Sequence, residues 1–144
     1  MKELDYYKDV GILIGSRAFG GTTNIGTDWD FIVKAEDIPL HINCTRPDDR
    51  TKYTSLPIGV IDMFYTDTPQ GLVNVQVVES ATTFTKFQKA RDIMNTAGKV
   101  LEKDKRINNW RLSMALAGIQ KYIAWPATAP TIRSFLTKLK GLFK

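Results

Sequence analysis

The chain has 144 residues, 43% of them hydrophobic and 24% charged, and its formal net charge at pH 7 is +5. This composition is typical of a folded globular protein and not of a disordered one, and the lack of any apolar run of about eighteen residues predicts no membrane span. The single cysteine, Cys44, excludes an intramolecular disulfide and a thiol-rich zinc site. Because the charged N-terminus also lacks the apolar segment of a signal peptide, we expect a cytoplasmic location.

The first half of the chain alternates between apolar runs and polar connections. We expect a short helix over residues 2–8, a strand over residues 10–14 and a second strand over residues 30–34, because both strands are short apolar runs. The stretch 35–56 is polar and contains prolines, which indicates a long excursion away from the sheet.

Two further strands are expected over residues 58–65 and 72–79. The link between them, Asp67-Thr68-Pro69-Gln70-Gly71, is rich in turn-forming residues. This arrangement predicts an antiparallel hairpin.

From Ala81 the apolar residues recur at helical spacing. One helix is expected from there to near Gly98 and a second over about residues 104–124, and a last amphipathic helix follows Pro130. The expected apolar stripes of the first two helices are Phe84, Phe87, Ala90, Met94 and Ala97, and Leu112, Leu116, Ile119 and Ile123.

Together these elements predict an α+β fold, with a small mixed or antiparallel sheet and C-terminal helices. We expect one domain over residues 1–144, with the αβ core in about residues 1–80 and the helical part in about residues 81–144. The apolar stripes of the helices predict either core packing or a surface for a partner protein or a second copy of the chain.

Charge is distributed unevenly along the chain. Residues 1–98 hold ten Lys or Arg and thirteen Asp or Glu, whereas residues 99–144 hold ten Lys or Arg and only two acidic residues. The basic excess of the C-terminal part favours RNA, DNA or an acidic protein as a partner. The alternative is that its lysines form only the solvated face of a helix.

The segment between the first two expected strands, Gly15–Asp30, reads GSRAFGGTTNIGTDWD and carries most of the functional signal. Side chains alternate across a strand, so Asp28 and Asp30 are expected on one face and Trp29 on the other. Two neighbouring carboxylates repel each other, a cost that is accepted mainly where cations bind. Oxygen ligands of this kind suit Mg²⁺, which usually binds through one or two carboxylates together with substrate phosphates.

The opposite end of the same segment is suited to phosphate. Gly15 has no Cβ and lets the backbone approach a phosphate closely. Ser16 and Arg17 are expected at the start of a short helix, where backbone N–H groups favour an anion. The Ser16 hydroxyl and the Arg17 guanidinium would add hydrogen bonds to phosphate oxygens, although Arg17 could equally form a surface salt bridge.

An apolar strand, Gly-Ser, about ten further residues and Asp-x-Asp form a pattern that resembles the DNA polymerase β-like nucleotidyltransferase superfamily. The form GSRAFG…TDWDF looks most like its minimal branch, which holds the antitoxins paired with HEPN-domain toxins and small nucleotidyltransferases, some encoded by phages. The resemblance covers roughly residues 8–34. It implies that Gly15 and Ser16 contact a nucleoside triphosphate, with ATP as the default, and that Asp28 and Asp30 hold Mg²⁺ or Mn²⁺.

A third carboxylate on a later strand normally completes the site in that superfamily. Asp62 is the expected third ligand or base, because it interrupts the apolar strand 58–65 and a buried, unpaired carboxylate is costly. The strand 72–79 competes for this position and carries amides where a base is wanted. If that strand occupies the position, the site lacks its base.

The sequence therefore predicts a metal-dependent nucleotidyltransferase that moves a nucleoside monophosphate from an NTP to a hydroxyl of a protein, RNA or small-molecule acceptor. Asp28, Asp30 and Asp62 would hold the metal ions, and Gly15, Ser16 and Arg17 the triphosphate. The alternative is a weak or inert protein of the same fold that binds a partner protein, as an antitoxin-like or phage-encoded regulator.

Overall fold

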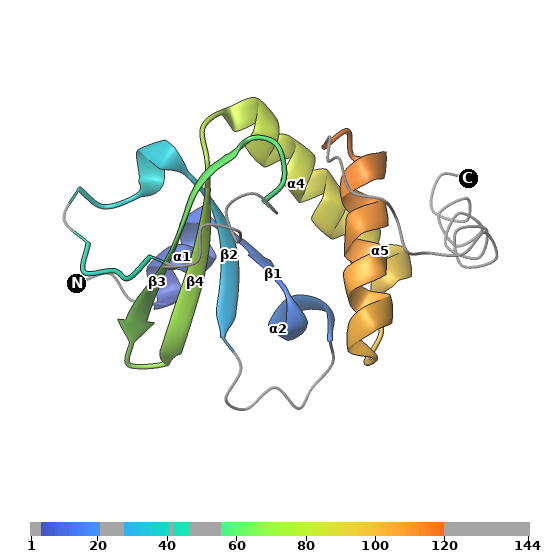
Figure 1. Cartoon of the computed structure of the whole chain (residues 1–144), viewed down its shortest axis with the longest axis horizontal. Coiled ribbons are helices and arrows are strands. Elements are labelled where there is room, and N and C mark those ends of the chain that lie inside the picture. Colours follow the sequence, from blue (N-terminus) through green and yellow to red (C-terminus); the bar gives the residue numbers. More distant parts are fainter. Residues whose placement is uncertain (1–3, 21–27, 41, 47–55, 120–144) are drawn as a thin grey trace.

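The computed structural model describes residues 4–20, 28–40, 42–46 and 56–119, and this part combines a four-stranded sheet with helices (Figure 1). The strands are β1 (Ile12–Ile14), β2 (Trp29–Lys34), β3 (Val60–Thr68) and β4 (Gly71–Val78), in the order β1-β2-β4-β3. β2 and β4 pair in parallel, whereas β1–β2 and β4–β3 are antiparallel. The prediction of an α+β fold with a small mixed sheet is confirmed.

The hairpin of β3 and β4 forms where the sequence predicts it, with its turn at Pro69-Gln70. β3 is the outer strand of the pair and contains an irregularity in register between Val60 and Asp62. β4 is the inner strand and lies between β3 and β2. This order decides which side chains can reach the acidic segment that leads into β2.

The two faces of the sheet are covered by different helices. The helix α1 (Leu4–Val10) packs on the face that carries Phe31, Val33, Val75 and Val77. The helix α4 (Ala81–Ile93) packs on the opposite face, against Ile12, Ile14, Ile32 and Val78. In Figure 1, α4 and α5 lie side by side and are in contact with each other.

Because residues two apart on a strand share a face, Asp30 and Ile32 lie on the α4 face of β2. Asn74 and Gln76 occupy the same face of β4, since they pair with those two residues. The α4 face thus becomes polar at one end of the sheet, where the acidic segment enters.

The predicted apolar stripe of α4 is confirmed. Phe87 and Ala90 are buried on α4, and Met94 and Ala97 are buried on a π-helical extension, η2 (Met94–Gly98). Ser80 begins α4 as the cap, accepting a hydrogen bond from the Thr83 backbone N–H at 3.1 Å.

The next helix, α5 (Lys103–Leu116), is shorter than the predicted 104–124. It ends because Gly118 adopts a positive φ of 88°, and the N–H of Ile119 then bonds back to the carbonyl of Met114 at 2.9 Å. Leu112 and Ile119 are buried as predicted, but Leu116 is 42% exposed and does not belong to the buried stripe. Ile123, the last residue of the predicted stripe, lies outside the described residues. The helix expected after Pro130 lies outside the described residues.

The excursion 35–56 is partly described. It begins with a 3-10 turn, η1 (Ala35–Asp37), and later returns to the sheet, where Thr45 pairs with Tyr65 through backbone hydrogen bonds of 2.8 and 2.7 Å. Within the described ranges, no helix has the length and apolar character needed to cross a membrane.

Candidate functional site

The Gly-Ser turn and the acidic segment come together at the end of β1. Ile14 pairs with Asp30 across β1 and β2, and Gly15 follows directly. Gly15 has φ 75° and ψ −160°, a conformation that is essentially restricted to glycine. A Cβ at this position would also overlap the Asp30 carboxylate. The absence of a side chain at Gly15 is therefore what allows the carboxylate to lie against the turn.

Asp28 precedes β2 and Asp30 lies within it, close enough for their charges to interact. Burial raises the pKa of Asp30 to about 6, and the negative charge of Asp28 acts in the same direction. A hydrogen bond from the Asn74 side chain and the positive charge of Arg17 oppose this rise only in part. The pair is thus a partly desolvated acidic site, in which a bound cation would relieve both costs.

Asn74 is the β4 residue that pairs with Asp30. Its amide donates a hydrogen bond to the Asp30 carboxylate, and its Oδ1 is buried without a hydrogen-bond partner. An orphaned buried acceptor is costly. Asn74 thus places an unpartnered amide oxygen on the strand next to Asp30.

The structure does not bring Asp62, the predicted third carboxylate, together with Asp28 and Asp30. Asp62 pairs with Val77, whose side chain belongs to the cluster on the α1 face, whereas Asp30 and Asn74 lie on the α4 face. The reason is the strand order: parallel pairing with β2 places β4, and not β3, beside the acidic segment.

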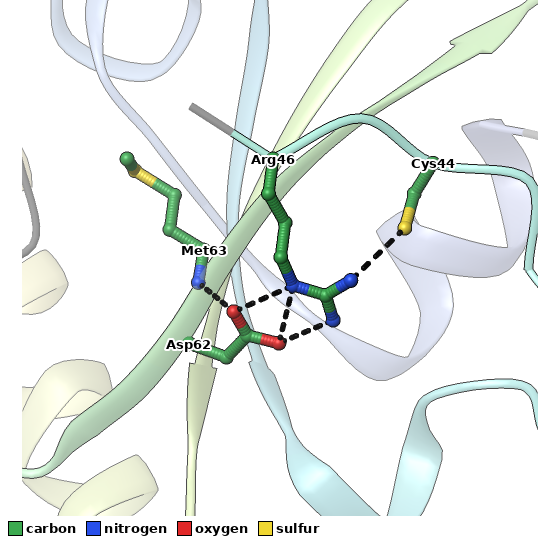
Figure 2. A network of polar contacts seen from close by, with 4 residues as sticks. All are labelled: Cys44, Arg46, Asp62 and Met63. Carbon is green, nitrogen blue, oxygen red and sulfur yellow. Dashed lines mark hydrogen bonds and ion pairs between the residues drawn. The ribbon is translucent and has the colours of Figure 1, made fainter. Parts of the chain in front are cut away.

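Asp62 instead forms an ion pair with Arg46 (Figure 2). Arg46 Nη2 donates to Oδ2 at 2.6 Å, and Arg46 Nε also donates to the carboxylate, at 3.1 Å to Oδ1. The backbone N–H of Met63 donates to Oδ1 at 2.8 Å. These hydrogen bonds, those from Arg46 first, hold the pKa of Asp62 below its usual range. The positive charge that pairs with the Asp62 carboxylate is therefore the guanidinium of Arg46.

Ser16 and Arg17 begin α2 (Ser16–Phe19), a single turn anchored by hydrogen bonds from the N–H groups of Ala18 and Phe19 to the Gly15 carbonyl. A helix this short contributes little dipole, so an anion here would be bound mainly by side chains and by local N–H groups. The Arg17 guanidinium stacks on the Trp29 ring, with its Cζ 3.9 Å from the ring centroid. Both predicted phosphate-binding side chains thus lie on the turn next to Asp30.

Trp29 was expected only on the face opposite the two aspartates, and the structure adds two cationic side chains against it. Its ring contacts Arg17, and Lys8 Nζ lies 4.8 Å from the same ring centroid. The available signal was its position between the two aspartates, at the start of β2.

Comparisons of the chain with protein-family models, with curated proteins and with solved structures found no match. The chemistry of the described side chains is therefore what indicates a ligand for this site. The part of the chain that the structure describes holds no group of three or more His, Cys, Asp or Glu side chains that could bind a metal. Two carboxylates and one amide oxygen remain, and these hard oxygen ligands fit Mg²⁺ or Mn²⁺.

Replacement of Asp30 with asparagine is expected to stabilise the metal-free protein at pH 7. Its carboxyl has a pKa raised from 3.8 to about 6, and one pKa unit corresponds to about 1.4 kcal/mol, so the gain should be about 1 to 3 kcal/mol. The cost of ionising Asp30 in the folded protein is absent below pH 3.8 and complete above about pH 6. The stability gained by Asp30→Asn therefore increases as the pH rises through this range.

Urea unfolding of wild type and Asp30→Asn at pH 4 and at pH 7 measures this difference. The variant should be more stable at pH 7, and the difference should shrink at pH 4. An equal difference at both pH values would contradict the assignment of the effect to ionisation.

Proposed function

We propose that this protein is a metal-dependent nucleotidyltransferase that transfers a nucleoside monophosphate from an NTP to a hydroxyl group. The observation that carries the proposal is the contact between Gly15 and Asp30, which joins a phosphate-type turn to a metal-type acidic pair. Neither feature alone is specific. Their direct contact matches what a magnesium-bound triphosphate requires, since its phosphates and its cation must be held side by side.

In this proposal Asp28 and Asp30 hold the divalent cation, with Asn74 Oδ1 as a further oxygen ligand. The cation supplies neutralisation of the charge on the phosphates and on the leaving pyrophosphate. Gly15 gives the phosphates access to the backbone, and Ser16 and Arg17 donate hydrogen bonds to them. Most of the catalysis is then positioning and charge neutralisation.

The proposal includes membership of the DNA polymerase β-like superfamily, in its minimal branch. Support comes from the mixed sheet, on which the Gly-Ser turn follows one strand and the Asp-x-Asp motif enters the antiparallel neighbour. ATP is the proposed default nucleotide. The acceptor is a hydroxyl of a protein, an RNA or a small molecule, and the basic residues 99–144 favour an acidic or nucleic-acid acceptor.

The test is transfer of label from each α-labelled NTP, with Mg²⁺ or Mn²⁺, into a mixture of cellular protein and RNA. Label that appears in one product and requires the metal would support the proposal and would identify the class of acceptor. A parallel calorimetric titration with Mg²⁺–ATP tests nucleotide binding without an acceptor. Absence of both transfer and metal-dependent binding would contradict the proposal.

A second candidate function is favoured by Asn74. An amide cannot take a proton from an attacking hydroxyl, so a site with Asn74 beside Asp30 lacks the general base that a carboxylate would supply. The protein would then be a catalytically weak or inert member of the same fold that acts by binding a partner protein.

Replacement of Asn74 with aspartate separates the two candidates. A general base contributes about 10²-fold or more to a rate, so in a weak enzyme Asn74→Asp should raise transfer by about that factor. It should also tighten Mn²⁺ binding, measured by electron paramagnetic resonance. A decrease in transfer would instead identify the Asn74 amide as a required ligand. Partner binding that is insensitive to both Asn74→Asp and Asp28→Ala would support the non-catalytic candidate.

A further inference from the structure

The Trp29 ring is fixed in place independently of Arg17. Its Nε1 donates a hydrogen bond to the carbonyl of Gln70, in the turn between β3 and β4, at 3.2 Å. The ring also packs against the buried cluster on the α1 face, and its backbone pairs with Val73 of β4. Trp29 is thus a rigid aromatic platform at the end of the sheet.

Two cationic side chains from different helices lie against this platform. Arg17 Cζ of α2 lies 3.9 Å from the ring centroid, and Lys8 Nζ of α1 lies 4.8 Å from it. Both distances fall within the range of cation–π attraction, and tryptophan is the most favourable of the aromatic partners.

The positive charge of Arg17 also acts on Asp30, as the smallest of the influences on the pKa of that carboxyl. An arginine side chain next to two carboxylates would normally collapse onto them in a bidentate ion pair. Stacking on Trp29 engages the face of the guanidinium, whereas an arginine makes its hydrogen bonds at the N–H edge. The anchored ring therefore sets the plane of the guanidinium at the end of the sheet where β2 begins.

We propose that Trp29 is a positioning residue, which holds the Arg17 guanidinium in the orientation that binds the phosphates of a metal-bound nucleoside triphosphate. This inference rests on the proposed function and assigns a role to the residue between the two aspartates. Lys8 adds a second positive charge against the same ring. The site is then divided into a cation-binding half, Asp28 and Asp30, and an anion-binding half arranged around one indole ring.

The test is a double-mutant cycle on the full chain, with the dissociation constant of Mg²⁺–ATP measured by isothermal titration calorimetry. Arg17→Ala and Trp29→Leu should each weaken binding about five- to tenfold, the effect of losing one partly desolvated cation–π and phosphate contact. The double variant should bind no more weakly than either single variant. This non-additivity distinguishes positioning from a general structural effect, which would weaken binding further.

Two further variants complete the design. Trp29→Phe keeps an aromatic face and should fall between wild type and Trp29→Leu. If Trp29→Leu does not fold, the cycle is run with Trp29→Phe. Arg91→Ala is the matched control, because Arg91 bonds Asp92 on α4 and does not contact the ring. Its affinity for Mg²⁺–ATP should equal that of wild type.

If the losses of affinity in Arg17→Ala and Trp29→Leu multiply in the double variant, the inference is overturned and the proposed function stands. The same holds if Trp29→Leu binds Mg²⁺–ATP as tightly as wild type. If neither wild type nor Asp28→Ala binds ATP in a magnesium-dependent way, the proposed function is overturned, and this inference with it. The two failures are therefore distinguishable.

Discussion

Replacement of Asp28 with alanine is expected to lower nucleotidyl transfer by about 10³-fold or more. A metal ion contributes several kcal/mol to stabilisation of charge in the transition state, and about 1.4 kcal/mol corresponds to a factor of ten in rate. Asp28 precedes β2 and does not belong to the buried core. The variant should therefore retain its fold, which circular dichroism and thermal unfolding can verify. Initial rates of label transfer with saturating Mn²⁺ measure the effect.

The matched control for this experiment is Asp62→Asn. Both changes remove one acidic charge, but Asp62 lies on the other face of the sheet and is paired with Arg46. Transfer by Asp62→Asn should stay within about twofold of wild type, since a surface ion pair contributes only about 0–1 kcal/mol. A loss in Asp62→Asn as large as that in Asp28→Ala would contradict the site described above.

Replacement of Gly15 with alanine is expected to destabilise the protein by about 2 to 6 kcal/mol. The backbone conformation at Gly15, with φ 75° and ψ −160°, costs a residue with a side chain about 1 to 3 kcal/mol. The collision of the new Cβ with the Asp30 carboxylate adds a further cost of about 1 to 3 kcal/mol. Chemical unfolding in urea measures the loss, which should be accompanied by weaker nucleotide binding.

Gly118→Ala separates the two contributions. Gly118 also has a positive φ, of 88°, but a Cβ there would meet only the end of Lys86, at 3.8 Å. Its replacement should therefore cost only the backbone strain of a left-handed residue with a side chain, about 1 to 2 kcal/mol. Equal losses in Gly15→Ala and Gly118→Ala would show that the contact between turn and carboxylate contributes nothing to stability.

The parts of the fold that depend on local pattern could be predicted from the sequence. The α4 stripe follows from helical spacing, and the β3–β4 hairpin follows from two apolar runs around a Pro-Gln turn. The meeting of Gly15 with Asp30 was also predictable, because the strand before the turn and the strand after the aspartates pair directly. The end of α5 carried a visible signal, Gly118, which the predicted boundary did not use.

The role of Asp62 could not be predicted, because it depends on which strand lies beside β2. Asp62 and Asn74 occupy strands with similar apolar patterns, and nothing local states that β4 crosses over to pair in parallel with β2. The partner of Asp62, Arg46, comes from a polar excursion with no periodicity. Contacts between segments far apart in the sequence are set by the global packing, which a pattern of single residues does not encode.

The attachment of residues 42–46 to β3 also bears on self-association. β3 is a long outer strand, and an outer strand with free backbone groups is a template for pairing with another molecule. Here the backbone of Thr45 occupies the N–H and carbonyl of Tyr65, while the ion pair of Arg46 with Asp62 holds the same segment against the strand. The acidic residue that interrupts this apolar strand thus helps to shield the edge of the sheet from intermolecular strand addition.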